Sequence, residues 1–282
     1  MDYTLAQMNP MTGDIEGNRK QIEETIQEAD SDVVVFPEMA LPGYCVGDRV
    51  ENDQFVEENL DALERIAEET DDTAAVVGYL DADGEERYNA AAVLHDGEVQ
   101  GTVYKRLLPN YRYFDDERYF EAGEEAGVVS LMLDDEELDL GVSICEDMWD
   151  EEYEESPIAD LAAAGADIVI NINASPFEPG KREQRDAIIR EHVEETGLSF
   201  LYVNTVGAAD VGKNVLAFDG ESRVYSGEGE LVAVADRFEE TAVTVDPVEA
   251  DIVEPEDASR EESIYEALTM ALRDYMDKNG FE

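Results

Sequence analysis

The sequence predicts an α/β protein with four layers, in which two mixed β-sheets pack face to face and helices cover their outer faces. Three observations carry this prediction. Short β-rich runs alternate with longer runs of helical periodicity along the whole chain, turn signals separate several of the β-rich runs, and 43% of the 282 residues are hydrophobic. Mixed βα units and hairpins bury their apolar faces as packed sheets with helices outside. At this length we expect one domain with a sizeable core.

The strands are predicted from short runs rich in Val, Ile, Leu, Phe and Tyr. In chain order they cover Tyr3–Met8, Val33–Pro37, Ala74–Leu80, Asn89–His95, Val99–Tyr104, Val128–Leu133, Leu138–Ile144, Ile168–Asn171, Phe200–Asn204, Val215–Phe218, Ser222–Tyr225, Leu231–Ala235 and Ala242–Val245. Turn residues between neighbouring runs predict hairpins at His95-Asp96-Gly97, Asp83-Gly84, Asp219-Gly220 and Gly227-Glu228-Gly229.

Helices are predicted where apolar residues recur every three or four positions. These segments are Glu16–Asp30, Asp53–Thr70, Glu152–Ala164, Arg182–Thr196 and Glu261–Lys278. The stretch Val248–Ser259 is rich in acidic residues and proline, and it predicts a solvated connection before the last helix. Residues 1–282 are therefore expected to form a single domain, with 248–282 as a C-terminal connection and helix.

The charge balance excludes several functions. Asp and Glu number 72 against 19 Lys and Arg, which gives a formal net charge of −53. A nucleic-acid binder needs a basic stripe and an anionic membrane would repel this chain, so we expect neither partner. The acidic residues are spread along the chain, which favours a halophilic source whose molar salt shortens the Debye length to about 3 Å. An acidic protein with a cationic partner is the alternative.

The cysteines and the N-terminus indicate the compartment. The chain has no run of 18 apolar residues, and its first residues lack a basic region followed by an apolar core. We therefore expect neither a membrane span nor a signal peptide, and we expect a cytoplasmic location. The two cysteines, Cys45 and Cys145, are then expected to be free thiols, and they are too few to build a structural zinc site alone.

Three of the predicted strands end in a reactive side chain: Glu38, Lys105 and Cys145. Ligand sites in α/β folds gather at the carboxyl ends of strands. A carboxylate within hydrogen-bond reach can deprotonate a thiol, and an ammonium stabilises both the thiolate and the oxyanion formed when it attacks an amide carbonyl. Each residue also has a simpler interpretation: Cys145 as a buried small hydrophobe, Glu38 as a helix-capping acid and Lys105 as a surface cation. Spacing alone leaves the catalytic and the simpler interpretations open.

Longer motifs surround these three residues. They are Val35-Phe36-Pro37-Glu38 with Pro42-Gly43-Tyr44, then Tyr104-Lys105-Arg106-Leu107-Leu108-Pro109-Asn110-Tyr111, and then Gly141-Val142-Ser143-Ile144-Cys145-Glu146-Asp147-Met148-Trp149. In order and interval they resemble the Glu, Lys and Cys motifs of the nitrilase superfamily of carbon-nitrogen hydrolases across nearly the whole chain. The resemblance implies catalysis by Glu38, Lys105 and Cys145 in one carbon-nitrogen hydrolase domain, without a metal or an organic cofactor.

Within that superfamily, the chain is similar to the glutaminase domain of glutamine-dependent NAD synthetases. The resemblance is carried by the segments Leu108–Tyr111, Phe114–Phe120, Ile144–Trp149, Asn173–Phe177 and Gly180–Arg182. It implies that glutamine is held by Tyr44, Tyr111, Glu146 and Ser175, with Lys181 near the substrate carboxylate. The chemistry agrees, because an amino acid needs an anion for its ammonium and a cation for its carboxylate.

That family places an assisting glutamate about eleven residues after the lysine, where this chain has Asp116 with Glu117 beside it. Either carboxylate could assist. The resemblance further implies a homodimer or larger assembly, through a surface that begins at Trp149 and includes the predicted helix 152–164.

The predicted function is hydrolysis of a primary amide, glutamine first, with ammonia passed to a separately encoded synthetase. Two alternatives stay open. One is a free-standing amidase that acts on an ω-amide, an N-carbamoyl amino acid or an aliphatic amide. The other is a catalytically idle regulatory subunit, against which the intact set of Glu38, Lys105 and Cys145 argues.

Overall fold

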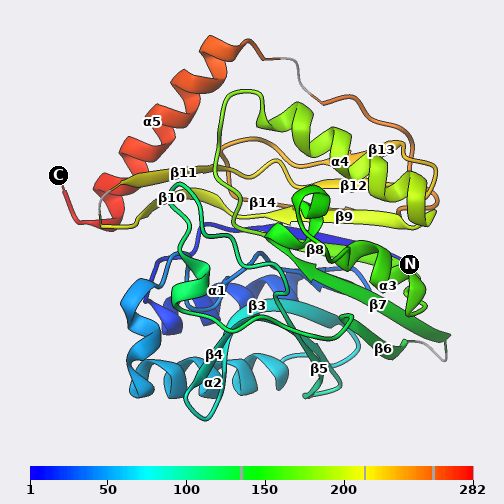
Figure 1. Cartoon of the computed structure of the whole chain (residues 1–282), viewed down its shortest axis with the longest axis horizontal. Helices are drawn as coiled ribbons and strands as arrows, with labels where there is room; N and C mark the ends of the chain where they lie inside the picture. Colours follow the sequence, from blue (N-terminus) through cyan, green and yellow to red (C-terminus); the bar gives the residue numbers. More distant parts are fainter. Residues whose placement is uncertain (134–135, 213, 256–257, 282) are drawn as a thin grey trace.

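The computed structural model describes residues 1–133, 136–212, 214–255 and 258–281. Two six-stranded mixed sheets pack face to face, and helices cover both outer faces, so the predicted four-layer architecture is confirmed (Figure 1). Two more strands, β10 and β11, pair with each other beside the sandwich. Among the described residues, no helix has both the length and the apolarity needed to cross a membrane.

The first sheet is parallel at its centre and antiparallel at its edges, because β1, β2 and β3 are joined by helices whereas β3, β4 and β5 are joined by tight turns. In spatial order its strands are β14 (Thr241–Val245), β1 (Tyr3–Gln7), β2 (Val33–Val35), β3 (Ala74–Asp83), β4 (Glu86–His95) and β5 (Glu98–Tyr104).

The second sheet repeats this plan, with β7, β8 and β9 parallel and the outer pairs antiparallel. In spatial order its strands are β13 (Leu231–Val234), β12 (Arg223–Tyr225), β9 (Ser199–Asn204), β8 (Ile168–Asn173), β7 (Glu136–Ile144) and β6 (Val128–Leu133). The separate pair consists of β10 (Val206–Asp210) and β11 (Val215–Asp219).

Within the part of the chain that the structure describes, two helices cover each sheet and a fifth lies against the pair β10–β11 (Figure 1). The helices are α1 (Ile15–Glu28), α2 (Asp53–Ala67), α3 (Pro157–Ala163), α4 (Lys181–Thr196) and α5 (Arg260–Lys278), with short 3₁₀ turns η1 (Gly47–Glu51), η2 (Asp116–Arg118), η3 (Cys145–Met148) and η4 (Asp150–Glu152). Part of the predicted connection 248–259, residues 256–257, lies outside the described residues.

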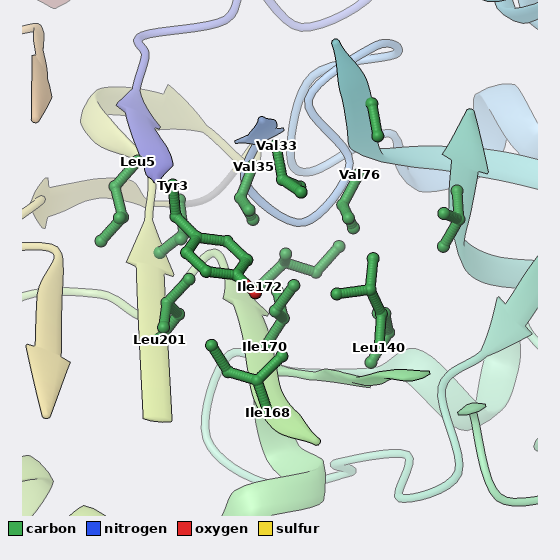
Figure 2. Packing of buried hydrophobic residues seen from close by; sticks show 14 of the residues in the cluster. Tyr3, Leu5, Val33, Val35, Val76, Leu140, Ile168, Ile170, Ile172 and Leu201 are labelled. Carbon is green, nitrogen blue, oxygen red and sulfur yellow. The ribbon is translucent and has the colours of Figure 1, made fainter. Parts of the chain in front are cut away.

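The core between the sheets follows from strand alternation. Val33 and Val35 of β2 face the second sheet, where Ile170 of β8 lies in the same cluster (Figure 2). Val34 points to the opposite face of the strand and packs in a cluster with Ile22 of α1. Because both faces of β2 are buried, its sequence is uniformly apolar rather than alternating. Burying one such side chain contributes about 1.5–3 kcal/mol to stability.

Two predictions about local structure are wrong, and one strand has no counterpart among the predicted elements. The helix predicted from Glu152 begins at Pro157, because proline suits the first helical turn and the preceding acidic run places like charges four residues apart. Asp219-Gly220 does not close a hairpin, since β11 pairs with β10 whereas β12 pairs with β9 and β13. Strand β10 was not predicted, because its sequence Val-Gly-Ala-Ala-Asp lacks the large residues that indicate a strand.

Candidate active site

The strand ends bring Glu38, Lys105 and Cys145 together at one edge of the sandwich. Glu38 lies three residues beyond β2, Lys105 directly follows β5, and Cys145 follows β7 as the first residue of η3. All three are buried, with exposed fractions of 0%, 1% and 5%. The segment that carries Glu38 passes so close to β3 that a Cβ at Gly78 would lie 2.2 Å from the Pro37 carbonyl oxygen, so this strand position requires glycine.

The Glu38 carboxylate is held by donors at both of its oxygens. Its Oε1 accepts hydrogen bonds from Lys105 Nζ at 2.8 Å and from Asn89 Nδ2 at 2.7 Å. Its Oε2 accepts from the backbone N–H of Ala174 at 2.8 Å. These donors come from the residue after β5, from β4 and from the loop after β8, so the orientation of the carboxylate depends on both sheets.

Lys105 lies between two carboxylates, because its ammonium also donates to Asp116 Oδ2 at 2.8 Å. Burial by itself would lower the pKa of Lys105, but the charges of Asp116 and Glu38 outweigh burial and raise that pKa well above its usual value. Burial raises the pKa of Asp116, and the charge of Lys105 partly offsets that rise.

The structure separates the two predicted assisting carboxylates. Asp116 is 5% exposed and contacts Lys105, as just described. Glu117 is exposed, and its Oε2 accepts a hydrogen bond from Asn110 Nδ2 at 2.8 Å. Of the two, Asp116 is therefore the one that the fold brings to the buried site.

Cys145 has an unusual backbone conformation and a buried thiol. Its φ of +50° lies in the left-handed region, a strained conformation for a residue with a Cβ, and such strain clusters at functional sites. Burial raises the pKa of Cys145 well above its usual value, the charge of Glu38 raises it further, and Lys105 opposes both. Burial and Glu38 thus disfavour the thiolate, so the attack of Cys145 on a carbonyl calls for a base.

Asp147 joins the segment after Lys105 to the turn that carries Cys145. Its Oδ1 accepts from the backbone N–H groups of Arg106 at 3.0 Å and Leu107 at 2.8 Å, and its Oδ2 accepts from that of Ile144 at 2.9 Å. Burial raises the pKa of Asp147 to about 6, and these three backbone donors limit the rise.

Glu146, the residue after the nucleophile, is 4% exposed and is held by two tyrosines. Its carboxylate accepts from Tyr111 Oη at 3.0 Å and from Tyr153 Oη at 3.0 Å. Burial raises the pKa of Glu146, and the charge of Lys105 and the two phenols counteract the rise. The nearby carboxylate raises the pKa of both tyrosines, as does their own burial.

Lys181 begins α4, and its ammonium lies 4.8 Å from the centroid of the Trp149 ring. Burial lowers the pKa of Lys181 and the positive charge of Arg185 lowers it further, whereas the carboxylates of Glu178 and Glu146 oppose this fall. An anion and a cation thus lie near the nucleophile on different elements.

Ser175 and Tyr44 occupy the remaining predicted positions. Ser175 follows β8, is 2% exposed, and its Oγ accepts a hydrogen bond from Arg185 Nη2 at 3.2 Å. Tyr44 is 8% exposed and contacts Phe218 edge-on, at 6.0 Å between ring centroids. Tyr44 lines a cavity of about 1020 Å³, as do Tyr111, Asp116 and the free thiol Cys45.

Sequence reasoning missed Asn89, Asp147 and Tyr153 as members of the site. Asn89 is the residue with an available signal, because an asparagine next to the apolar run Ala90–Leu94 in a buried strand needs a hydrogen-bond partner. Tyr153 carries no such signal, since its contact with Glu146 depends on how η4 turns the chain back.

Taken together, a buried thiol, a fixed carboxylate and an ammonium held between two acids can add sulfur to a carbonyl carbon and stabilise the oxyanion. Known proteins agree with this chemistry. A family model described as carbon-nitrogen hydrolase matches residues 4–253. Glutamine-dependent NAD(+) synthetase of Xylella fastidiosa is 37% identical over 289 residues, which cover 98% of this chain and 51% of that protein. The same enzyme of Thermotoga maritima is 36% identical over 322 residues, covering 99% and 54%.

Solved structures give the same result. Glutamine-dependent NAD+ synthetase from Acinetobacter baumannii, in complex with ADP, superposes with a TM-score of 0.87 at 32% identity, covering 98% of this chain and 52% of that one. An amidase from Nesterenkonia sp. shares the fold, with a TM-score of 0.74 at 22% identity over 87% of this chain and 89% of its own. The chain spans about half the length of the curated relatives it matches. The resemblance seen in the sequence is thus confirmed, and the chain belongs to the carbon-nitrogen hydrolase family, the nitrilase superfamily, as a hydrolase that acts on carbon-nitrogen bonds.

Proposed function

We propose that this hydrolase converts glutamine to glutamate and ammonia, with Cys145 as nucleophile, Glu38 as general base and Lys105 as oxyanion donor. The observation that carries the choice of substrate is the pair of opposite charges beside the nucleophile. Glu146 is fixed by two phenols to receive an ammonium, and Lys181 is placed over Trp149 to receive a carboxylate. Tyr44, Tyr111 and Ser175 complete the proposed substrate-binding set.

In the proposed first half-reaction, Glu38 takes the proton of Cys145 as Sγ bonds to the amide carbon. Lys105 and the backbone N–H of Glu146 stabilise the oxyanion that develops. Collapse of the tetrahedral intermediate breaks the carbon-nitrogen bond, and Glu38 returns the proton to the leaving nitrogen, which departs as ammonia. A thioester on Cys145 remains.

In the second half-reaction, water adds to the thioester while Glu38 takes one of its protons. Collapse releases glutamate and returns the proton to the thiolate, so the enzyme is restored without a metal or an organic cofactor. Asp116 assists in this scheme by keeping Lys105 protonated and directed at the carbonyl oxygen, which its 2.8 Å contact supports.

We further propose that the ammonia serves NAD synthesis, which the relatives named above, glutamine-dependent NAD(+) synthetases, support. We also propose that the protein assembles as a homodimer or larger homo-oligomer, through the surface that starts at Trp149 and includes α3. A cytoplasmic location and a halophilic source are part of the same proposal. The net charge of −53 supports the last of these.

A substrate panel at molar KCl tests the choice of glutamine. We expect ammonia release from glutamine, and Glu146→Gln is expected to lower kcat/KM for glutamine about 10- to 100-fold, because it removes a charged hydrogen-bond partner. Glu117→Gln is the matched control, since Glu117 is exposed and bonded to Asn110. Release from asparagine, an N-carbamoyl amino acid or an aliphatic amide, with glutamine inert, would assign the enzyme to the free-standing amidases.

A further inference from the structure

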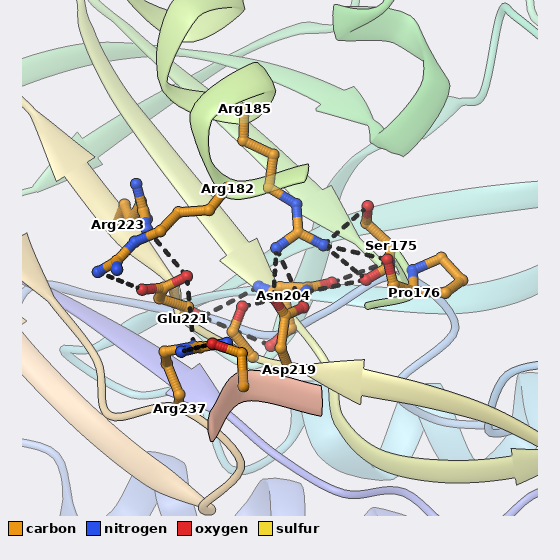
Figure 3. Close-up of polar contacts among 12 residues, drawn as sticks. Ser175, Pro176, Arg182, Arg185, Asn204, Asp219, Glu221, Arg223 and Arg237 are labelled. Carbon is orange, nitrogen blue, oxygen red and sulfur yellow. Dashed lines mark hydrogen bonds and ion pairs between the residues drawn. The ribbon is translucent and has the colours of Figure 1, made fainter. Parts of the chain in front are cut away.

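A buried arginine lies directly behind the loop that follows β8. The Arg185 side chain, from the second turn of α4, is 1% exposed, although an isolated guanidinium is costly to bury. It packs 5.5 Å from the centroid of the Tyr202 ring. A buried charge needs an opposite charge and hydrogen-bond acceptors around it, and Arg185 has such partners on both edges of its guanidinium (Figure 3).

One edge is neutralised by an acid. Arg185 Nη1 donates to both carboxylate oxygens of Asp219, at 3.0 and 2.9 Å, and Asp219 is 2% exposed. The other edge serves the loop, because Nη2 donates to the carbonyl oxygens of Ser175 at 3.0 Å and Pro176 at 3.4 Å, and to Ser175 Oγ at 3.2 Å (Figure 3). Arg185 therefore joins the end of β11 to this loop.

Asn204, at the end of β9, holds the same loop from a second side. Its Oδ1 accepts from the backbone N–H of Ser175 at 2.9 Å, and its Nδ2 donates to the carbonyl oxygens of Ser175 at 3.2 Å and Gly220 at 3.1 Å. The polar groups of Ser175 are thus held by two side chains that both connect to the segment Asp219-Gly220.

The fixed loop reaches the catalytic carboxylate through its first residue. The backbone N–H of Ala174 donates to Glu38 Oε2 at 2.8 Å, and Ala174 is fully buried. An unbroken series of contacts therefore runs from Asp219 through Arg185 and Ser175 to the N–H group that orients Glu38. A shift of this loop would turn or release the carboxylate oxygen that faces it.

We propose that Arg185, charge-balanced by Asp219, is a positioning residue for amide hydrolysis. It fixes the loop 174–176 so that the Ala174 N–H holds Glu38 in the orientation that deprotonates Cys145. Arg185 contacts neither the nucleophile nor the base directly, so its effect passes through the loop. This inference rests on the proposed roles of Glu38 and Cys145 and is independent of which amide is the substrate.

A second buried arginine provides the matched control. Arg223 is also 1% exposed, and its guanidinium contacts Glu221 at 2.9 Å (Figure 3). It also contacts Asp186 and the Tyr225 hydroxyl. These partners lie on α4, on β12 and just before β12, outside the loop 174–176. Changing Arg223 perturbs a buried ion pair of the same kind without touching the loop that orients Glu38.

The test compares Arg185→Lys with Arg223→Lys at molar KCl and well below both melting temperatures. Lysine keeps the charge beside Asp219 but lacks the second edge that serves the loop. We expect Arg185→Lys to lower kcat for ammonia release by roughly 10- to 100-fold, the scale of a misplaced catalytic group. The rate of Cys145 alkylation by iodoacetamide near pH 7, followed by peptide mapping to separate it from Cys45, is expected to fall in parallel. Arg223→Lys is expected to keep both rates within about threefold of the wild type, the smaller change that a purely structural substitution is expected to cause.

Alkylation requires no substrate, so it tests the positioning role even if glutamine is not hydrolysed. The inference would be overturned if Arg185→Lys kept the kcat and the Cys145 alkylation rate of the wild type. It would also be overturned if Arg223→Lys lowered both rates as much as Arg185→Lys does. If Arg185→Lys fails to fold, the double variant Arg185→Gln with Asp219→Asn removes both charges together, so that no uncompensated buried charge is left. A folded double variant with the same two losses supports the inference, and one with wild-type rates contradicts it.

Discussion

Individual residues of the site differ in how far the sequence could predict them. Glu38, Lys105 and Cys145 could be found because each ends a β-rich run and lies in a longer motif. The partners of Glu38 could not, because Asn89 and Ala174 are 51 and 136 residues away along the chain. Choosing between Asp116 and Glu117 required η2, whose single turn buries the first and exposes the second.

Asp116→Asn tests the electrostatic role of that residue. It removes one of the two carboxylates that raise the pKa of Lys105, so the pKa of Lys105 is expected to fall and the ammonium to be lost at lower pH. We expect kcat near pH 7 to fall about 10- to 100-fold, and the alkaline limb of the pH profile to move to lower pH. Initial rates between pH 6 and 10 measure both effects. An unchanged profile, or an equal loss in Glu117→Gln, would remove Asp116 from the mechanism.

At the scale of elements, the sequence predicts most strands and four of the five helix starts to within a residue or two. These elements succeed because their apolar periodicity is long and both faces of the central strands are buried. The predicted start of α3 is wrong because the sequence pattern extends the helix into the acidic run before Pro157. Strand β10 is not predicted because its residues are small. Neither error moved the site, which the carboxyl ends of β2, β5 and β7 position.

The link between two of these elements gives a pH-dependent prediction. Asp147 joins the segment after β5 to η3, and its pKa in the folded protein is raised from 3.8 to about 6. Protonated Asp147 therefore stabilises the folded protein below about pH 4, by up to about 3 kcal/mol. This contribution is lost as the pH rises through 6.

Asp147→Asn lacks this titration. The unfolding free energy of the wild type minus that of the variant is therefore expected to fall between pH 4 and 7, which urea unfolding at constant salt measures. At pH 7 the asparagine would direct an NH₂ group at a backbone donor, so ammonia release is also expected to fall. Parallel stability curves for the two proteins would contradict the assigned ionisation.

At the scale of the whole molecule, the scarce cations lie inside as well as outside. Lys105, Arg185 and Arg223 are each 1% exposed and paired with acids, which leaves much of the acidic excess on the surface. The sequence could predict the net charge of −53 but not this distribution, which depends on tertiary pairing. Surface self-repulsion is screened by salt, whereas the buried pairs are screened much less.

Salt is therefore expected to stabilise the fold. Raising KCl from about 0.1 M to 2 M shortens the Debye length from about 10 Å to below 3 Å, and we expect the melting temperature to rise by roughly 10 °C. Circular dichroism during thermal unfolding measures this shift, with sucrose at matched water activity as a control for general solute exclusion. A melting temperature that is independent of KCl would contradict the halophilic interpretation.

Ammonia release provides a direct test of whether Cys145 forms the covalent intermediate of an amide hydrolysis. Wild type and Cys145→Ala are compared with glutamine at molar KCl, after circular dichroism has shown that both are folded. We expect steady release by the wild type and a rate below about 0.1% of that value for the variant, because the variant lacks the thiol that is proposed to carry the acyl group. Turnover retained by Cys145→Ala would contradict this proposal.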